Sequence, residues 1–255
     1  MRDTMPEASA RTHGGGPRIA FFGGSFDPPH LGHLAVARAA LAALGLDCVL
    51  FAPVGAQPLK LHGSTASFED RAELTRLAIA GEPGFAVTLA DAPKPSGAPN
   101  YTIDTLLSLR AELPLDAVLF CLMGADAFFG LRQWHRSAEI PFVATLIVAS
   151  RPGQQHELLI DDLNVALPAG LTVEAESGVD EFRSGVELRS YLLQNPQGHA
   201  TTLYLLPGLD VEISASQVRE QIREELRSGD GASRVGNQLL PAAIFEAIRA
   251  RGLYR

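Results

Sequence analysis

The stretch GGSFDPPHLGH, residues 23–33, directly follows a short apolar run at residues 18–22. Two glycines leave a predicted strand, two prolines set a turn and the start of a helix, and two histidines stand three residues apart. Because residues three apart lie on one side of a helix, both histidine rings can point into one site. A tight turn at a helix N-terminus offers backbone N–H donors and partial positive charge, so the stretch predicts a phosphate site.

Apolar runs alternate with helical patterns along most of the chain. Such alternation is typical of a parallel sheet with crossover helices, so we predict an α/β fold with a doubly wound, mostly parallel sheet. In such sheets the ligand site lies beyond the carboxyl ends of the strands, where the opening motif stands. The predicted strands cover residues 19–22, 48–52, 85–89, 117–122, 142–149 and 202–206. The predicted helices are one that follows the motif and stops at Gly45, and those at 69–80, 103–112, 216–227 and 241–251.

The organisation along the chain indicates one domain. Residues 1–17 have no apolar segment of the signal-peptide kind and are predicted to form a flexible tail. Residues 18–255 are predicted to form the single domain, with a helical part at the C-terminal end. Residues 154–200 show no clean period and are interpreted as an elaboration of that domain.

Composition excludes several classes of partner. The chain has 255 residues, 46% of them hydrophobic and 20% charged, which is ordinary for a globular protein. Its net charge of -8 argues against a nucleic-acid or acidic-membrane surface, which clustered Lys and Arg would serve. No run approaches the roughly 18 apolar residues of a membrane span. Cys48 and Cys121 lie in apolar runs, which favours a reduced, cytoplasmic protein.

The chemistry of the histidine pair has two interpretations. The chain contains neither G-x-x-x-x-G-K-[ST] nor G-x-G-x-x-G after the first strand, so phosphate must be held by other groups. His30 and His33 can each donate a hydrogen bond, and a protonated ring adds charge where a transferring phosphoryl group accumulates it. The alternative is a surface pair or a structural zinc site, but zinc needs about four ligands and the two cysteines form no ligand-spaced pair.

A second candidate anion site begins at Ser214. The spacing Ser214-x-x-Gln217 matches a capping box, which would be a purely structural feature. A capped helix N-terminus also suits phosphate oxygens, and Arg219 and Arg223 lie one turn apart on one face of that helix. The two interpretations are compatible.

The opening motif resembles that of the HxGH nucleotidyltransferases, and its full form resembles that of bacterial nicotinate-mononucleotide adenylyltransferases. Residues 58–60, Pro-Leu-Lys, are similar to that family's Pro-Pro-His-Lys loop, although Leu59 replaces the histidine. Residues 101–105 match its Y-T-x-x-T segment, and Gly124, Asp126 and Trp134 match its G-x-D...W segment.

Residues 213–219, ISASQVR, resemble the family's I-S-S-T-x-I-R signature, with Ala215 and Ser216 departing from the commonest residues. The loss of a hydroxyl at 215 removes any role for that side chain but leaves the anion site itself. The resemblance covers residues 18–153 and 202–251.

The resemblance implies a Rossmann-like fold and an enzyme of NAD biosynthesis that transfers AMP from ATP to nicotinate mononucleotide, releasing pyrophosphate. Mg²⁺ would accompany ATP, and no metal ligand is assigned in the chain. The implied catalytic residues are His30, His33 and Arg219. The implied ATP contacts are Gly23, Gly24, Ser25, Phe26, Lys60, Gly124, Asp126, Ser214 and Ser216. The implied contacts to the acceptor nucleotide are Thr102, Trp134 and Arg151.

Other interpretations stay open at this point. The acceptor could be nicotinamide mononucleotide or phosphopantetheine, and a regulatory protein could retain the nucleotide pocket without turnover. A single tryptophan such as Trp134 is often a core residue, and Lys60 in a proline-rich loop is often simply solvated. The oligomeric state does not follow from the sequence.

Overall fold

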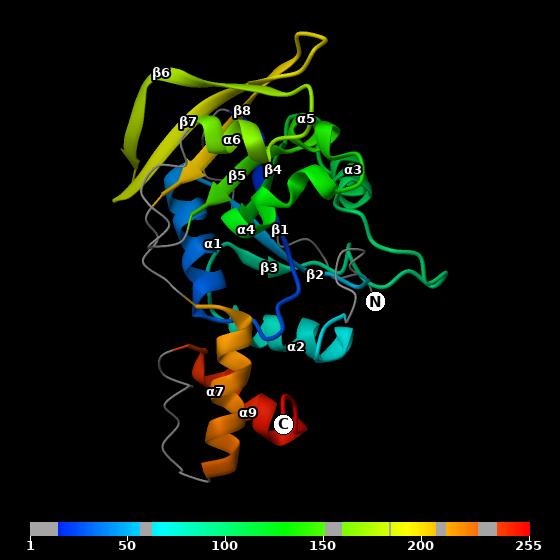
Figure 1. The fold of residues 1–255 in the computed structure, drawn as a ribbon. Helices are drawn as coiled ribbons and strands as arrows, with labels where there is room; N and C mark the ends of the chain where they lie inside the picture. The colour runs from blue at the N-terminus through cyan, green and yellow to red at the C-terminus, as the bar shows by residue number, and fades with distance from the viewer. Residues whose placement is uncertain (1–14, 57–62, 151–159, 184, 208–212, 229–238) are drawn as a thin grey trace.

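The computed structural model describes residues 15–56, 63–150, 160–183, 185–207, 213–228 and 239–255. Within these residues one sheet of eight strands runs in the order β3-β2-β1-β4-β5-β8-β7-β6 (Figure 1). The strands are β1 (Arg18–Gly24), β2 (Cys48–Pro53), β3 (Phe85–Val87), β4 (Val118–Gly124), β5 (Thr145–Ala149), β6 (Thr172–Arg183), β7 (Val186–Gln194) and β8 (Ala200–Leu206).

The six neighbouring strands β3, β2, β1, β4, β5 and β8 are parallel. Strand β7 runs antiparallel to β8, and β6 runs antiparallel to β7. The chain order reverses at β1, which pairs with β2 on one side and β4 on the other. Such a reversal opens a crevice at the carboxyl ends of the two central strands. The predicted α/β fold with a doubly wound, parallel-dominated sheet is therefore confirmed.

The helices lie between consecutive strands and at the C-terminal end. Helix α1 ends at Gly45, whose φ of 57° is the left-handed conformation expected of a glycine stop. The α-helices are α1 (Leu31–Leu44), α2 (Phe68–Ala78), α3 (Thr102–Glu112), α4 (Ala125–Phe129), α5 (Ile140–Val143), α6 (Ile160–Ala166), α7 (Ala215–Ser228) and α9 (Ala242–Arg251). Two short 3₁₀ turns, η1 (Leu131–Gln133) and η2 (Ser137–Glu139), follow α4.

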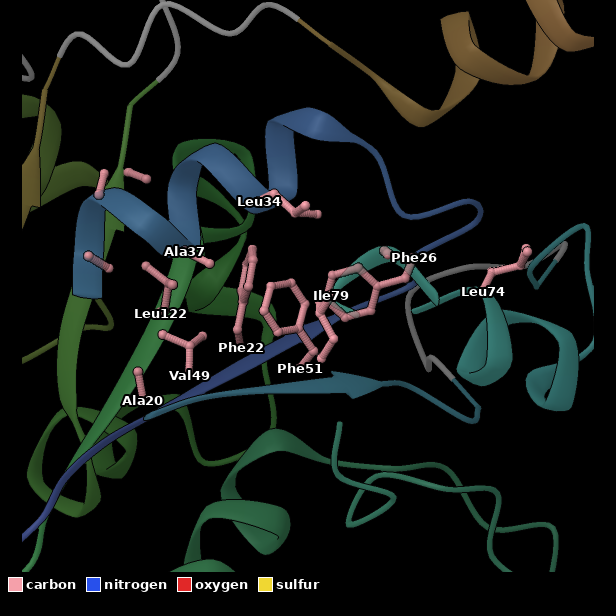
Figure 2. Packing of buried hydrophobic residues seen from close by; sticks show 14 of the residues in the cluster. Ala20, Phe22, Phe26, Leu34, Ala37, Val49, Phe51, Leu74, Ile79 and Leu122 are labelled. Carbon is pink, nitrogen blue, oxygen red and sulfur yellow. The ribbon is translucent and has the colours of Figure 1, made fainter. Parts of the chain in front are cut away.

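Two hydrophobic layers hold the sheet between helices. Because side chains alternate along a strand, Ala20 and Phe22 of β1 face one layer and Ile19 and Phe21 face the other. The first layer also receives side chains from α1, α2, α7 and α9, and Figure 2 shows Phe22 within it. The second layer receives side chains from α3, α4, α5 and α6. Each face of the sheet is thus covered by its own set of helices.

The predicted strand at residues 142–149 was wrong at its beginning. Residues Ile140–Val143 form α5, and β5 starts only at Thr145. Pro141 stands in the first turn of α5, where its missing N–H costs no helical hydrogen bond. An apolar run of this length reads equally as strand or buried helix, so its periodicity could not divide it.

Residues 160–183 and 185–194 form the elaboration that the sequence left without a structure. They supply α6 and the strands β6 and β7, which extend the parallel sheet by an antiparallel pair. Leu163 of α6 joins the second hydrophobic layer, so this segment shares the core of the rest of the sheet. Residues 154–159 and 184 lie outside the described residues.

Both cysteines are free and buried in central strands. Burial, with the nearby charge of Asp47, raises the pKa of the Cys48 thiol to about 11. Burial alone raises the pKa of Cys121 to about 12. Both therefore pack as neutral, small hydrophobic side chains. Among the described residues, no helix is long and apolar enough to cross a membrane. Residues 1–14 of the predicted tail lie outside the described residues.

Candidate active site

His30 and His33 meet at the N-terminus of α1. His30 is the N-cap residue, with an extended backbone, and its N–H donates to Nδ1 of His33 at 3.2 Å. The two rings stack with their centroids 3.7 Å apart. Since Nδ1 of His33 accepts, the neutral ring carries its proton on Nε2, which makes that nitrogen a donor. The structure thus brings the two predicted histidines together as a pair.

The glycines before the pair are needed for packing as well as for ligand approach. A Cβ on Gly23 would lie 2.9 Å from the ring of Phe21, and one on Gly24 would lie 3.1 Å from the ring of Phe26. Phe26 is buried, and its ring meets that of His33 edge-on at 4.9 Å. A larger residue at 24 would therefore displace the ring that supports His33, and one at 23 would displace Phe21 in the second hydrophobic layer.

The two prolines lie before the N-cap residue, not inside the helix. Helix α1 begins at Leu31, so Pro28 and Pro29 shape the loop rather than the first helical turn. The N–H of Leu31, one of the unpaired donors of a helix start, is satisfied by the carbonyl oxygen of Leu239 at 2.9 Å. A segment near the C-terminal end of the chain therefore helps to hold this loop.

Asp27 organises the loop, and the sequence did not single it out. Its buried carboxylate accepts hydrogen bonds from the N–H groups of Thr65 at 2.6 Å and Ala66 at 3.1 Å. The hydroxyl of Tyr254 donates to the same carboxylate at 2.8 Å. These bonds tie the opening motif to the start of α2 and to the C-terminal end of the chain. No spacing rule could have found them, because the partners lie 38, 39 and 227 residues away.

Arg71 supports the same loop through hydrogen bonds to backbone carbonyl oxygens. Its guanidinium donates to the backbone carbonyl oxygens of Ser25 at 2.6 Å, Val54 at 2.8 Å and Ala66 at 3.3 Å. The side chain is buried, and this desolvation lowers the pKa of the guanidinium, while the charge of Asp27 opposes the shift. Ser25, a predicted ATP contact, is therefore held in place through its backbone.

The second predicted anion site is joined to the first. Gln217 N–H donates to Ser214 Oγ at 3.3 Å, and Ser214 N–H donates to Gln217 Oε1 at 3.0 Å, so the capping box is present. Arg219, in the same helix, donates from Nη1 to the carbonyl oxygen of Asp27 at 2.7 Å and from Nη2 to Ser216 Oγ at 3.2 Å. The capping interpretation and the proximity to the histidine motif therefore both hold.

Gly124 and Asp126 lie at the carboxyl end of β4, beside the end of β1. Gly124 is the N-cap residue of α4, and Asp126 stands in the first turn of that helix. A Cβ added to Gly124 would meet no atom within 4 Å, and its φ of -77° suits any residue. Packing therefore gives no reason for glycine here, whereas a nucleotide lying over this end of the strand would.

Part of the Y-T-x-x-T segment is structural. Thr105 Oγ1 donates at 2.8 Å to Asp91, whose burial raises the pKa of its carboxyl. Asn100 accepts from the N–H of Ala56 at 3.1 Å and donates to the carbonyl oxygen of Ala92 at 2.9 Å. These bonds fasten α3 and the loop before it to the loops that follow β2 and β3. The position of Thr102, the first residue of α3, is therefore fixed.

The predicted acceptor residues lie at two element ends. Thr102 is the first residue of α3, and Trp134 follows η1, half-buried against the second hydrophobic layer. The N–H of Trp134 donates to the carbonyl oxygen of Leu131 at 2.9 Å, so it serves the turn. The ring of His135, which the sequence did not single out, lies 4.3 Å from that of Tyr101 and brings these two segments together.

Two predicted site residues, Lys60 and Arg151, lie outside the described residues. In the parts of the chain that the structure describes, no group of three or more His, Cys, Asp or Glu side chains could hold a metal ion.

The chain is similar to known proteins over nearly its whole length. The sequence model of the cytidylyltransferase-like family matches residues 21–221. A protein of Gloeobacter violaceus named "Probable nicotinate-nucleotide adenylyltransferase" is 35% identical over 240 residues, covering 94% of this chain and 97% of the relative. A protein of the same name from Sodalis glossinidius is 34% identical and covers 92% of this chain and 96% of its own length.

Solved structures share the fold. The Plasmodium falciparum nicotinic acid mononucleotide adenylyltransferase complexed with NaAD superposes with a TM-score of 0.59 at 14% identity, covering 93% of this chain and 97% of that one. At this identity the likeness supports the fold only. The sequence relatives, by contrast, match nearly the whole chain above 30% identity. This chain belongs to the nicotinate-nucleotide adenylyltransferases, nucleotidyltransferase enzymes within the cytidylyltransferase-like family.

Proposed function

We propose that this enzyme transfers the adenylyl group of ATP to nicotinate mononucleotide, giving deamido-NAD and pyrophosphate. A phosphate oxygen of the mononucleotide forms the new bond to the α-phosphorus of ATP, while the bond from that phosphorus to the pyrophosphate oxygen breaks. The observation that carries the proposal is the stacked His30 and His33 pair at a helix N-terminus, with Arg219 bound to the same loop.

The chain supplies positions and positive charge rather than a nucleophile. Phosphoryl and nucleotidyl transfers are accelerated mainly by alignment of the two reactants and by donors aimed at the developing charge. His30 and His33 contact the phosphate oxygens of ATP in this mechanism, and the N-terminus of α1 adds the partial positive charge of the helix dipole. No covalent enzyme intermediate is formed.

Arg219 holds the leaving pyrophosphate. A guanidinium has five N–H donors in a fixed fork, and the bonds to Asp27 and Ser216 orient it while using two of them. The capped helix that begins after Ser214 carries Arg219, so the bond from Arg219 to Asp27 connects this helix to the histidine loop. Binding the product oxygens more tightly as the bond breaks would stabilise the transition state specifically.

Mg²⁺ is proposed to enter with ATP. The carboxylate of Asp27, the acid nearest to the histidines in the sequence, already accepts three hydrogen bonds and is occupied by them. Mg²⁺ is commonly held by substrate phosphates and water with few protein ligands, which fits this set of residues. When bound, the ion supplies charge neutralisation on the phosphate oxygens.

The acceptor is proposed to lie over Thr102 and Trp134, while Gly124 and Asp126 are proposed to help hold ATP. Lys60 is proposed to contact ATP and Arg151 is proposed to contact the acceptor, both on the sequence resemblance alone. A pyridinium ring carries positive charge and is attracted to an aromatic face. The half-buried indole of Trp134 at the end of η1 suits that contact.

The decisive experiment measures pyrophosphate released by the purified protein from ATP and Mg²⁺ with one acceptor at a time. Nicotinate mononucleotide is expected to give the highest kcat/KM, ahead of nicotinamide mononucleotide and phosphopantetheine. A preference for either of the other two would replace the acceptor in the proposal. Failure of every acceptor, with ATP still bound, would instead support a regulator that does not turn over.

A further inference from the structure

The last residues of the chain reach the catalytic motif. Helix α9 ends at Gly252, whose φ of 66° turns the backbone out of the helix. The N–H of Leu253 then donates to the carbonyl oxygen of Ile248 at 3.0 Å, which closes the turn. Tyr254 follows, and its hydroxyl donates to Asp27 Oδ1 at 2.8 Å.

Tyr254 is held in an unfavourable backbone conformation. Its φ of 61° lies in the left-handed region, which residues with a bulky side chain rarely adopt. Such a conformation persists only where the surroundings determine it. Here the side chain is 5% exposed and packs in the first hydrophobic layer, so burial and the hydroxyl bond together hold it.

The tyrosine remains a hydrogen-bond donor at all ordinary pH values. Burial, and secondarily the charge of Asp27, raise the pKa of the hydroxyl well above its usual range. A protonated hydroxyl beside a carboxylate forms a charge-assisted bond, which is shorter and stronger than a neutral one. Asp27 therefore has a persistent partner at Oδ1, the oxygen that also accepts from the N–H of Ala66, while Oδ2 accepts from the N–H of Thr65.

The position of Asp27 affects both halves of the site. Along the chain it stands three residues before His30, and through its carbonyl oxygen it accepts the bond from Arg219. A rotation of the Asp27 side chain and backbone would therefore shift the histidine loop and release the arginine. The hydroxyl of Tyr254 opposes that rotation.

We propose that Tyr254 is a positioning residue for adenylyl transfer, acting through Asp27 to fix the positions of His30 and Arg219 relative to each other. This inference rests on the proposed function. Tyr254 does not touch the reacting atoms in this mechanism, so its loss should affect the rate of reaction more than the binding of either nucleotide. Misplacement of catalytic groups by about 1 Å can cost about a hundredfold in rate.

The test replaces the hydroxyl and keeps the ring. Tyr254→Phe is expected to lower kcat about tenfold or more, while KM for ATP and for nicotinate mononucleotide change less than about twofold, since the binding groups stay. Asp27→Asn removes the carboxylate charge from this bond and leaves one acceptor oxygen where Asp27 has two, so it also disturbs the bonds from Thr65 and Ala66. In this variant kcat is expected to fall at least as far as in Tyr254→Phe, again with little change in KM. This variant also serves if Tyr254→Phe does not fold.

Two controls separate positioning from stability. Tyr191→Phe removes the hydroxyl of a buried tyrosine of β7 in the second hydrophobic layer, and kcat should stay unchanged. Arg251→Ala removes the exposed 2.9 Å ion pair between Arg251 and Asp70, another contact of the same C-terminal segment, and kcat should again stay unchanged. All assays are run well below the melting temperature of each variant.

A double variant tests the route through Asp27. If Tyr254 and Arg219 act on one residue, the combined loss in Tyr254→Phe with Arg219→Lys should be smaller than the product of the single losses. A fully active Tyr254→Phe protein, or equal losses in the Tyr191 and Arg251 controls, would overturn the positioning role while leaving the proposed function intact. Wild-type protein without turnover would overturn both.

Discussion

Arg219 donates from Nη1 to the backbone carbonyl oxygen of Asp27 at 2.7 Å, joining residues 192 positions apart in the sequence. Its Nη1 also lies 3.9 Å from the Asp27 carboxylate, and the arginine side chain stays about one-fifth exposed. The bond brings a cation of helix α7 to the loop that carries His30. A single loop thus connects the two anion sites that the sequence suggested separately.

The histidine pair leads to the first prediction. His33→Ala should lower kcat about 10²–10³-fold, because one donor to developing charge is commonly worth that much. Stability should fall by about 1 kcal/mol, the usual cost of one helix-cap bond, which is much less than the loss in rate. The control His199→Ala removes an exposed imidazole from the turn between β7 and β8. Unchanged turnover in His33→Ala would remove the ring from the mechanism.

Arg219 should act through its forked geometry as well as its charge. Arg219→Lys keeps the charge but loses the paired donors, so kcat should fall and inhibition by pyrophosphate should weaken together. Steady-state kinetics with added pyrophosphate measure both effects. Arg227→Lys, an exposed change on the same helix, should alter neither. If only thermal stability falls in Arg219→Lys, the arginine is structural.

Substitution of Gly124 tests whether the nucleotide lies close to this residue without disturbing its packing. Gly124→Ala should leave the melting temperature nearly unchanged, because the added Cβ would meet no atom within 4 Å. KM for ATP should rise about fivefold or more, a loss of about 1 kcal/mol, if the nucleotide lies over this residue. The contrasting variant Gly23→Ala places its Cβ 2.9 Å from the Phe21 ring and should lose about 1–3 kcal/mol of stability. An unchanged KM in Gly124→Ala would move the nucleotide elsewhere.

Trp134 should affect the acceptor and not ATP. Trp134→Ala should raise KM for nicotinate mononucleotide by the equivalent of about 0.5–2 kcal/mol, the usual range for a cation on an aromatic face. KM for ATP is the internal control. Equal losses for both substrates would show that the indole is a core residue.

The wild-type enzyme should prefer the acid over the amide, because a site with matched hydrogen-bond donors rejects the ligand that leaves them unpaired.

Asp91 should make stability depend on pH. Burial raises the pKa of its carboxyl above the unfolded value of about 3.9, so the folded state holds the proton more tightly. The resulting stabilisation is complete below the unfolded pKa and is lost as pH rises through the folded pKa. Asp91→Asn keeps an acceptor for Thr105 and does not titrate. The free energy of unfolding of Asp91→Asn, measured in urea, should therefore rise relative to that of the wild type as the pH increases above about 4, the unfolded pKa. A constant difference would contradict the shift.

Much of the fold and of the candidate site followed from local patterns. The apolar runs predicted β1, β2 and β4, because buried parallel strands need continuous hydrophobic residues. The division of residues 140–149 into α5 and β5 did not follow, since a short apolar run fits either element. The antiparallel strands β6 and β7 were missed for a related reason, as a strand such as β7, with buried and partly buried residues mixed, gives a weak signal.

The sequence by itself determined the parallel sheet, the glycine turn and the placement of His30 and His33 on one helix end, because these depend on residues close together along the chain. Only the tertiary structure decided that Arg219 and Tyr254 converge on Asp27, across 192 and 227 residues. Hydrogen bonds between distant segments leave no periodicity in a sequence. They exist because α7 and α9 bury apolar faces in the first hydrophobic layer and so bring their polar ends to the opening motif.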